Sequence, residues 1–247
     1  MTRHDTINLK SPRNYETFIA GETIDLVVPN PKAIQQDGWH RWFNDPHVTR
    51  FLDHGYYPNT KEKQKEYLDG LVNQKDMSRL ALLIVPKNTN LAVGVASLSA
   101  INFIHRSAET AIVIGRRNPS KHSLFLALEA KARLVEHAFE KLGLLRIGGG
   151  QSEHLALWQS TQLIFGFRPE GLRRSAFRVG YRAYDIVLSG CTLRDYLRVK
   201  RSRGGNYWPG HSKLWEMIYE LPRESIVDRL RASLHEASSP YLKILGN

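Results

Sequence analysis

The spacing of hydrophobic residues changes near the middle of the chain, and this change limits the folds that the chain can adopt. Before it, three runs with the apolar character of strands follow one another at 80–86, 91–98 and 108–115. After it, apolar residues recur at helical spacing, at Leu124, Leu128, Val135, Phe139 and Leu142. Gly143 comes next, where a helix C-cap is expected. Consecutive strands followed by a long helix predict a sheet covered by helices.

The flanking segments extend this pattern. A strand is predicted at 22–29 and a short helical stretch at 31–43. A helix is predicted at 60–73, with Thr60 as its N-cap. After the long helix we expect a strand, a helix and two more strands, at 144–148, 153–165, 167–174 and 181–188. This order of elements is typical of an α+β fold.

The pattern divides the chain into three parts. Residues 1–20 show no periodicity and are interpreted as an N-terminal leader, and residues 21–190 are interpreted as the α+β domain. Residues 191–247 are interpreted as a helical extension, which is short for an independent domain. Pro222 is predicted to begin a helix there, with apolar positions at Ile226, Val227, Leu230 and Leu234.

The chain is strongly basic, with a formal net charge of +11 and a pI near 9.8. Two basic clusters stand out, one of Arg168, Arg173, Arg174, Arg178 and Arg182 and one of Arg194, Arg198, Lys200, Arg201 and Arg203. Such clusters attract phosphates or another acidic partner, although a solvated basic face is the alternative. Nucleic acid is not favoured as a partner, because no helix-turn-helix, zinc finger or RNP-type motif is present.

The sequence also predicts where in the cell the protein is located. No apolar run approaches the roughly 18–20 residues that span a bilayer, so no membrane partner is expected. The first twenty residues lack the apolar core of a secretory signal. Cys191 is the single cysteine, which excludes an internal disulfide and a multi-cysteine zinc site, and we interpret it as inert. We therefore expect a soluble cytoplasmic protein without a metal, of undetermined oligomeric state.

Three segments, in this order along the chain, resemble the GNAT acyltransferase superfamily. They are Trp42-Phe43-Asn44-Asp45-Pro46-His47-Val48, then Glu109-Thr110-Ala111-Ile112-Val113-Ile114-Gly115, and then Gly166-Phe167-Arg168-Pro169-Glu170-Gly171-Leu172-Arg173. The third is completed by the segment from Gly180 to Asp185 and is the most specific. The residues are similar to the branch that contains ribosomal-protein N-terminal acetyltransferases and amino-sugar N-acetyltransferases. The resemblance implies a mixed β-sheet with a splayed parallel strand pair and helices on both faces.

The resemblance also implies an acyl-CoA donor, bound in the gap beside the strand at 108–115. A backbone N–H there would polarise the thioester carbonyl. The loop after the strand and the N-terminus of the long helix would hold the pyrophosphate, because the first N–H groups of a helix have no internal partner. The residues assigned to the donor are Val113, Ile114, Gly115, Arg116, Arg117, Lys121, His122 and Ser123.

The donor loop departs from the family pattern at two glycine positions, which Ser123 and Phe125 occupy here. Side chains at these positions keep the backbone farther from a pyrophosphate. We expect the phosphates to lie farther out, held by the basic side chains before the helix. The alternative is that Phe125 turns into the core. Leu155 and Gln162 stand where many members have an asparagine and a tyrosine.

Glu109 is the candidate general base, because the superfamily often has a carboxylate at this place on the strand. His105 and His154 are alternative bases. Trp39, Trp42 and Asn44 lie on the acceptor side by resemblance, and Trp42 and Asn44 are assigned to the acceptor. A tryptophan can stack on a sugar, although core packing is its commoner fate.

The sequence therefore predicts an N-acyltransferase, in the first place an N-acetyltransferase. The acyl group would move from acetyl-CoA or another acyl-CoA to a primary amine of a small molecule, such as an amino sugar, or of a protein N-terminus. Two alternatives remain open at this point. One is a GNAT-fold binding or scaffold protein without activity, which the missing glycines and tyrosine favour. The other is an acyltransferase that uses an acyl carrier protein, whose acidic surface would suit the basic charge.

Overall fold

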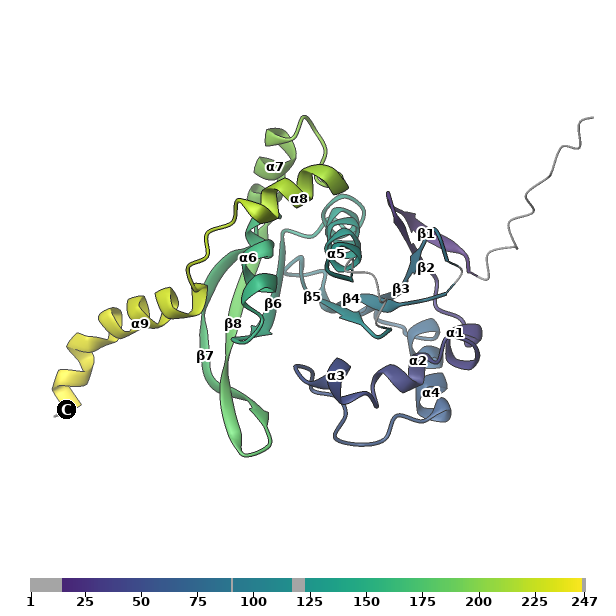
Figure 1. Cartoon of the computed structure of the whole chain (residues 1–247), viewed down its shortest axis with the longest axis horizontal. Helices are drawn as coiled ribbons and strands as arrows, with labels where there is room; N and C mark the ends of the chain where they lie inside the picture. The colour runs from purple at the N-terminus through teal and green to yellow at the C-terminus, as the bar shows by residue number, and fades with distance from the viewer. Residues whose placement is uncertain (1–14, 90, 117–122, 246–247) are drawn as a thin grey trace, which may run out of the picture.

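An eight-stranded sheet forms the centre of the molecule in the computed structural model, which describes residues 15–89, 91–116 and 123–245 (Figure 1). The strand order is β1-β2-β3-β4-β5-β6-β8-β7. The strands are β1 (Thr17–Ala20), β2 (Ile24–Val27), β3 (Leu80–Pro86), β4 (Gly94–Asn102), β5 (Ser107–Ile114), β6 (Arg146–Ser152), β7 (Arg168–Val179) and β8 (Arg182–Thr192). Neighbouring strands are antiparallel except for β5 and β6, which are parallel.

Helices cover both faces of the sheet. The helices are α1 (Pro31–Gln35), α2 (Trp39–Trp42), α3 (Pro46–Thr49), α4 (Lys61–Val72), α5 (Ser123–Glu140), α6 (Ala156–Ile164), α7 (Leu193–Ser202), α8 (His211–Tyr219) and α9 (Ile226–Leu242), and a 3₁₀ turn, Lys243–Leu245, follows. Figure 1 shows α5 and α6 on one side of the sheet and α1–α4 on the other. We call these sides the α5 face and the α4 face. The predicted mixed sheet with helices on both faces is confirmed.

The long helix α5 owes its place to an apolar surface that extends almost all around it. Leu128, Leu134 and Val135 are fully buried against the sheet. The Glu129 carboxylate on the same helix is also buried, and it accepts hydrogen bonds from the Thr23 hydroxyl at 2.6 Å and the Thr23 N–H at 3.1 Å. A buried carboxylate is tolerated where hydrogen bonds satisfy its oxygens. Glu129 therefore ties the β1–β2 turn to α5.

Most predicted elements are present, and three differences concern their limits. The predicted leader at 1–20 is too long, because Thr17–Ala20 forms β1 and pairs with β2. The boundary expected at residue 190 falls inside β8, where Cys191 and Thr192 still pair with β6. Pro222 lies in the linker before α9 rather than at its start. The Ser225 hydroxyl, which accepts from the Asp228 N–H at 3.2 Å, marks where that helix begins.

The C-terminal segment contains two helices that the sequence pattern did not indicate, α7 and α8. Its aromatic loop packs into the main core: Tyr207 is fully buried, and its hydroxyl donates to the Phe165 carbonyl at 2.7 Å. Tyr196 of α7 and Leu214 of α8 are also fully buried in this core. The segment up to α8 is therefore part of the same folded body. The helix α9 extends outward from β7 (Figure 1). None of the helices described is both long and apolar enough to cross a membrane.

Candidate active site

The parallel strands β5 and β6 separate part of the way along their length. They pair over three positions, Ser107 with Arg146, Ala108 with Ile147 and Glu109 with Gly148. Beyond these positions β5 continues to Ile114 paired with β4, and β6 continues to Ser152 paired with β8. One backbone edge of each strand therefore faces a gap, and such an edge presents unpaired N–H and C=O groups. The predicted splayed strand pair is confirmed.

Three consecutive glycines, Gly148, Gly149 and Gly150, line the β6 side of this gap. A side chain at Gly149 would begin 3.1 Å from the Thr110 carbonyl oxygen, and one at Gly150 would begin 2.7 Å from Ile186 Cγ2. The glycines thus leave room at the point where the strands separate. On the β5 side, Thr110 Oγ1 is buried and has no hydrogen-bond partner among the described residues.

On the α5 face, the long helix that follows the gap begins at Ser123. Phe125 has an exposed fraction of 6% and stacks on His211 and Trp215 of α8, with centroid distances of 5.5 and 5.3 Å. The expectation that its side chain stands between the backbone and a pyrophosphate is therefore wrong, and the alternative, in which Phe125 enters the core, is observed. The ring is drawn inward because α8 offers it two aromatic partners.

The basic residues assigned to the donor have different outcomes. Arg117, Lys121 and His122 lie outside the described residues. Arg116 is half-buried, and its guanidinium donates to the Asp37 carbonyl oxygen at 3.0 Å, on the linker between α1 and α2. This bond ties the end of β5 to the linker between α1 and α2. Whether the phosphates lie near it remains a prediction.

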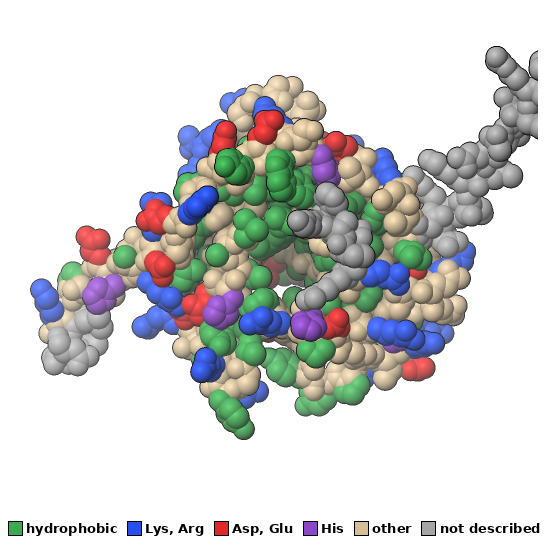
Figure 2. All heavy atoms as spheres, in the orientation of Figure 1, with side chains coloured by type: hydrophobic (Ala, Val, Ile, Leu, Met, Phe, Trp, Pro, Cys, Tyr) green, Lys and Arg blue, Asp and Glu red, His purple; other side chains and the backbone are tan. Residues whose placement is uncertain are grey.

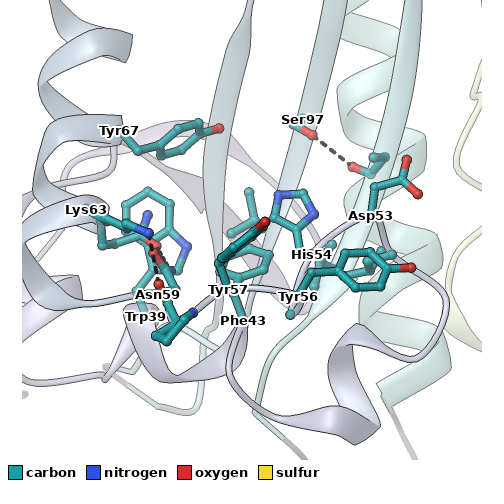
Figure 3. A pocket seen from close by; sticks show the side chains of 17 residues that line it. Trp39, Phe43, Asp53, His54, Tyr56, Tyr57, Asn59, Lys63, Tyr67 and Ser97 are labelled. Atoms are coloured by element: carbon teal, nitrogen blue, oxygen red, sulfur yellow. Dashed lines mark hydrogen bonds between the residues drawn. The ribbon is translucent and has the colours of Figure 1, made fainter. Parts of the chain in front are cut away.

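On the α4 face, a cavity of about 520 Å³ lies over β4 and β5 (Figure 3). Its floor is formed by Val95 and Ser97 of β4 and by Ala111 and Val113 of β5. Aromatic and polar side chains from α2, α4 and the 52–59 loop surround it: Trp39, Phe43, Asp53, His54, Tyr56, Tyr57, Asn59, Lys63 and Tyr67. The cavity can therefore enclose a small molecule and offer it both ring faces and hydrogen-bonding groups.

This cavity continues along the sheet towards Glu109. A second hollow of about 490 Å³ shares His54, Tyr67 and Ser97 with it. A third, of about 420 Å³, meets the second at Ala100 and is lined by Glu109 and the glycines of β6. Figure 2 shows this side of the molecule hollowed near its centre. Neighbouring hollows thus share lining residues all the way from the aromatic side chains to the gap between β5 and β6, and we call the three together the groove.

Glu109 lies at the end of the paired part of β5, opposite Gly148, and its side chain is exposed. Side chains alternate along a strand, so Glu109 shares a face with Ala111 and Val113. Ala111 is two residues away, which is about 7 Å along the strand. Glu109 therefore lies where the groove meets the gap.

Three charged neighbours line the same hollow as Glu109. Arg146 binds Glu170 through two hydrogen bonds, of 2.6 and 2.5 Å. This pair fits because position 190 is glycine: a side chain there would begin 2.5 Å from the Glu170 carboxylate. Arg173 makes no ion pair with any residue that the structure describes. Among the described residues, Glu109 and Arg173 are thus the charged side chains of this hollow that form no ion pair and can bind a ligand.

Trp42 and Asn44, which were assigned to the acceptor, do not line the groove. Trp42 is buried against the backbone of Gly115, where a Cβ atom would lie 2.1 Å from the indole. The Asn44 side chain donates to the Asn59 carbonyl at 2.8 Å and accepts from the Asn59 N–H at 2.7 Å. In this arrangement the two residues hold the layer of short helices in place, and their assignment to the acceptor stays a prediction. The neighbouring Trp39 and Phe43 line the cavity instead.

The two alternative bases also lie away from Glu109. His105 is exposed in the β4–β5 turn and lines none of the hollows described above. His154 follows β6 and lies between the rings of Phe51 and Tyr184, at 6.1 and 4.5 Å. His154 thus helps to connect the loop after α3 with the β7–β8 hairpin. The Tyr56 hydroxyl makes a second connection, to the Arg178 carbonyl at 3.2 Å.

Lys131 is a functional candidate that sequence reasoning missed. It lies inside the α5 face with an exposed fraction of 2%, and its ammonium donates to Gln162 Oε1. The Phe167 ring centroid is 3.8 Å from Nζ, but the structure gives Lys131 no acidic partner among the described residues. Burial lowers the pKa of Lys131 from 10.5 to about 7. The sequence signal that could have identified it is a lysine at a position of the long helix that is otherwise apolar.

Cys191 is buried, and burial raises the pKa of its thiol to about 12, which keeps it in the unreactive thiol form. Within the described ranges, no group of three or more histidine, cysteine or acidic side chains is arranged to hold a metal ion.

Comparison with known proteins identifies the family. The model of the acetyltransferase (GNAT) domain matches residues 30–152, which include β3, β4, β5, α5 and β6. The chain belongs to the GNAT acetyltransferase superfamily. It is 24% identical over 160 residues to the uncharacterized N-acetyltransferase p20 of Bacillus licheniformis, covering 63% of this chain and 86% of that protein. The family and this relative make the chain an acetyltransferase.

Solved structures support the same fold. Spermidine N-acetyltransferase from Vibrio cholerae, in complex with CoA and spermine, is 20% identical, with a TM-score of 0.62 over 71% of this chain and 98% of that one. A putative acetyltransferase is 25% identical, with a TM-score of 0.56 over 75% and 91% of the two chains. Another, from T. thermophilus, is 24% identical, with a TM-score of 0.58 over 76% and 94%. The similarity thus covers nearly all of these proteins but leaves about a quarter of this GNAT chain unmatched.

Proposed function

We propose that the protein is an N-acetyltransferase that moves the acetyl group of acetyl-CoA to a primary amine of a small molecule. The observation that carries this proposal is the groove on the α4 face, which joins an aromatic cavity to the gap between β5 and β6.

The gap fits the pantetheine arm of the donor. The arm is a narrow chain with amide groups, and the β5 backbone beyond Glu109 offers unpaired edge groups to bind it. The glycines at 148–150 leave space for it, and the orphaned Thr110 hydroxyl lies on β5 at this point. A CoA complex of a similar protein, the Vibrio cholerae spermidine N-acetyltransferase, supports acyl-CoA as the co-substrate.

The aromatic cavity fits the acceptor. Its rings suit an acceptor with a cyclic or apolar portion, such as an amino sugar, because aromatic faces bind such groups by stacking. The Vibrio cholerae protein binds spermine, which supports a small-molecule amine. A volume near 520 Å³ favours a small molecule over a folded protein surface.

In the proposed reaction the neutral amine attacks the carbonyl carbon of the thioester. Glu109 takes up the proton that the amine loses, directly or through one water molecule. The carbon–sulfur bond then breaks, and CoA leaves as a thiolate that is protonated to the thiol. Backbone N–H groups of β5 near Val113 and Ile114 stabilise the charge that develops on the carbonyl oxygen.

A substitution that fills the aromatic cavity tests the proposed acetyltransferase function. Ala111→Phe fills the floor of the groove, so we expect kcat/KM for the amine to fall by about 100-fold or more, while CoA binding persists. The matched control is Ala237→Phe on the exposed surface of α9, which should change neither. The measurement uses acetyl-CoA with polyamines, amino sugars and short peptides, detecting free thiol and acetylated product by mass spectrometry.

The outcomes separate the alternatives. Binding of CoA without transfer to any amine would favour the scaffold protein. Transfer from an acyl carrier protein but not from acetyl-CoA would favour the carrier-protein donor. Acetylation of peptide N-termini alone would replace the small molecule by a protein acceptor.

A further inference from the structure

The helix α8 lies across the beginning of α5, and its position is fixed by the core. Leu214 of α8 is fully buried, and the preceding Trp208 is largely buried, with its indole N–H donating to Glu22 at 2.6 Å. On the side towards α5, His211 and Trp215 stack on Phe125, which is the third residue of α5. Residues 193–245 follow the last strand and lie beyond the part matched by the family model. This segment therefore brings its own aromatic side chains to the first turn of α5.

Trp215 remains largely exposed in this arrangement. Its ring lies 5.3 Å from the Phe125 ring at an interplanar angle of 29°, yet 62% of its surface is accessible. Tyr219, one turn further along α8, and Leu157 on α6 are exposed as well. Figure 2 shows apolar side chains gathered over α6 and α8. An exposed cluster of this kind on a soluble fold marks a binding site more often than a single exposed apolar residue does.

A cavity of about 490 Å³ lies beside Trp215, between α6, α8 and the linker to α9. Trp215 and Tyr219 provide aromatic rings, Ser160 provides a hydroxyl, and Arg223 provides a cation that forms no ion pair with the described residues. A flat heteroaromatic ring attached to a phosphorylated sugar matches this set: the ring stacks on tryptophan or tyrosine, and the phosphate binds arginine.

We propose that this cavity holds the adenosine end of acyl-CoA, with the adenine ring stacked on the exposed face of Trp215. This inference rests on the proposed function, because it assumes an acyl-CoA donor in the gap. The donor's pyrophosphate would lie near the first N–H groups of α5, and Phe125 links that turn directly to Trp215. Phe125, which stands where the family has a glycine, thus supports the tryptophan that binds adenine.

The test compares Trp215→Ala with the control Tyr181→Ala, which removes an exposed ring from the tip of the β7–β8 hairpin. Three ligands are used: CoA, adenosine 3′,5′-bisphosphate, and acetyl-pantetheine, which lacks the adenosine end. Loss of one stacking side chain typically weakens base binding by about 5-fold to 100-fold. We expect calorimetry to give about tenfold weaker binding of CoA and of the bisphosphate to the Trp215→Ala variant. The KM for acetyl-pantetheine should stay unchanged, and Tyr181→Ala should match the wild type throughout.

Trp215→Phe keeps a ring and should restore most of the binding, which separates stacking from a change in folding. Equal affinity of wild type and Trp215→Ala for CoA, with acetyl transfer intact, would overturn this inference and leave the proposed function standing. If no acetyl transfer is found but binding of the bisphosphate depends on Trp215, the proposed function is overturned and the adenosine site stands. A wild-type protein that binds neither CoA nor the bisphosphate contradicts both.

Discussion

The two faces of the sheet differ in how they are closed. On the α5 face, α5, α6 and the C-terminal segment pack into one core that buries Phe125 and even the lysine at position 131. On the α4 face, four short helices and their loops leave a groove of connected hollows above β4 and β5. Both faces meet at the gap beside Glu109. The larger apolar core therefore fixes the α5 face, whereas the α4 face has a smaller core beside β2 and β3 and stays open to a ligand above β4 and β5.

The largest effect on activity is expected from Glu109→Gln, at the end of the groove on the α4 face. If Glu109 accepts the proton of the amine and does not contact CoA, the variant should lose about 10²–10⁴-fold in kcat while its affinity for CoA stays the same. The amide cannot accept the proton, so part of the rate should return at high pH, where more of the amine is already neutral. Steady-state kinetics and calorimetry check the two parts. A wild-type rate at pH 7 removes Glu109 from the mechanism.

The next effect is expected where a helix of the α4 face touches the end of β5. Gly115→Ala places a methyl group 2.1 Å from the Trp42 indole, so the short helices must shift. Overpacking of this kind costs about 1–3 kcal/mol, and we expect about 3 kcal/mol in the free energy of unfolding by urea titration. Gly70→Ala in α4 is the control, since nothing lies within 4 Å of its Cβ position. It should stabilise by about 0.5–1 kcal/mol. Equal stabilities would show that the Trp42 contact is loose.

The smallest effect concerns the interior of the α5 face. The pKa of Lys131 is about 7 in the folded protein and 10.5 ordinarily, so between these pH values the unfolded chain carries a proton that the folded chain lacks. The free energy of unfolding should therefore rise with pH across this window. Lys131→Met should abolish this Lys131 contribution and, at pH 7, stabilise the protein by about 1–3 kcal/mol. The measurement is urea unfolding at several pH values. Parallel pH profiles of the two proteins would mean that Lys131 stays charged and solvated.

The sequence sufficed for the sheet because its strands and α5 carry strong periodic patterns. It failed at α7 and α8, whose buried residues Tyr196 and Leu214 are scattered among charged ones and are held by tertiary contacts alone. At the site, Glu109 could be placed because a strand position fixes its face. Trp42 could not be told from Trp39, because a four-residue helix gives no pattern that distinguishes the side turned to the cavity from the side turned to Gly115.

The gap between β5 and β6 has a further consequence for the kinetics of the enzyme. It begins after Glu109. In the proposed function the donor reaches it from the start of α5 and the acceptor from the groove of the α4 face, so the two substrates would use separate entrances. Neither molecule has to leave before the other arrives, and no group on the protein has to carry the acetyl group in between. Initial rates measured at several fixed concentrations of one substrate should therefore give intersecting double-reciprocal lines. Inhibition by each product should show no fixed order of binding.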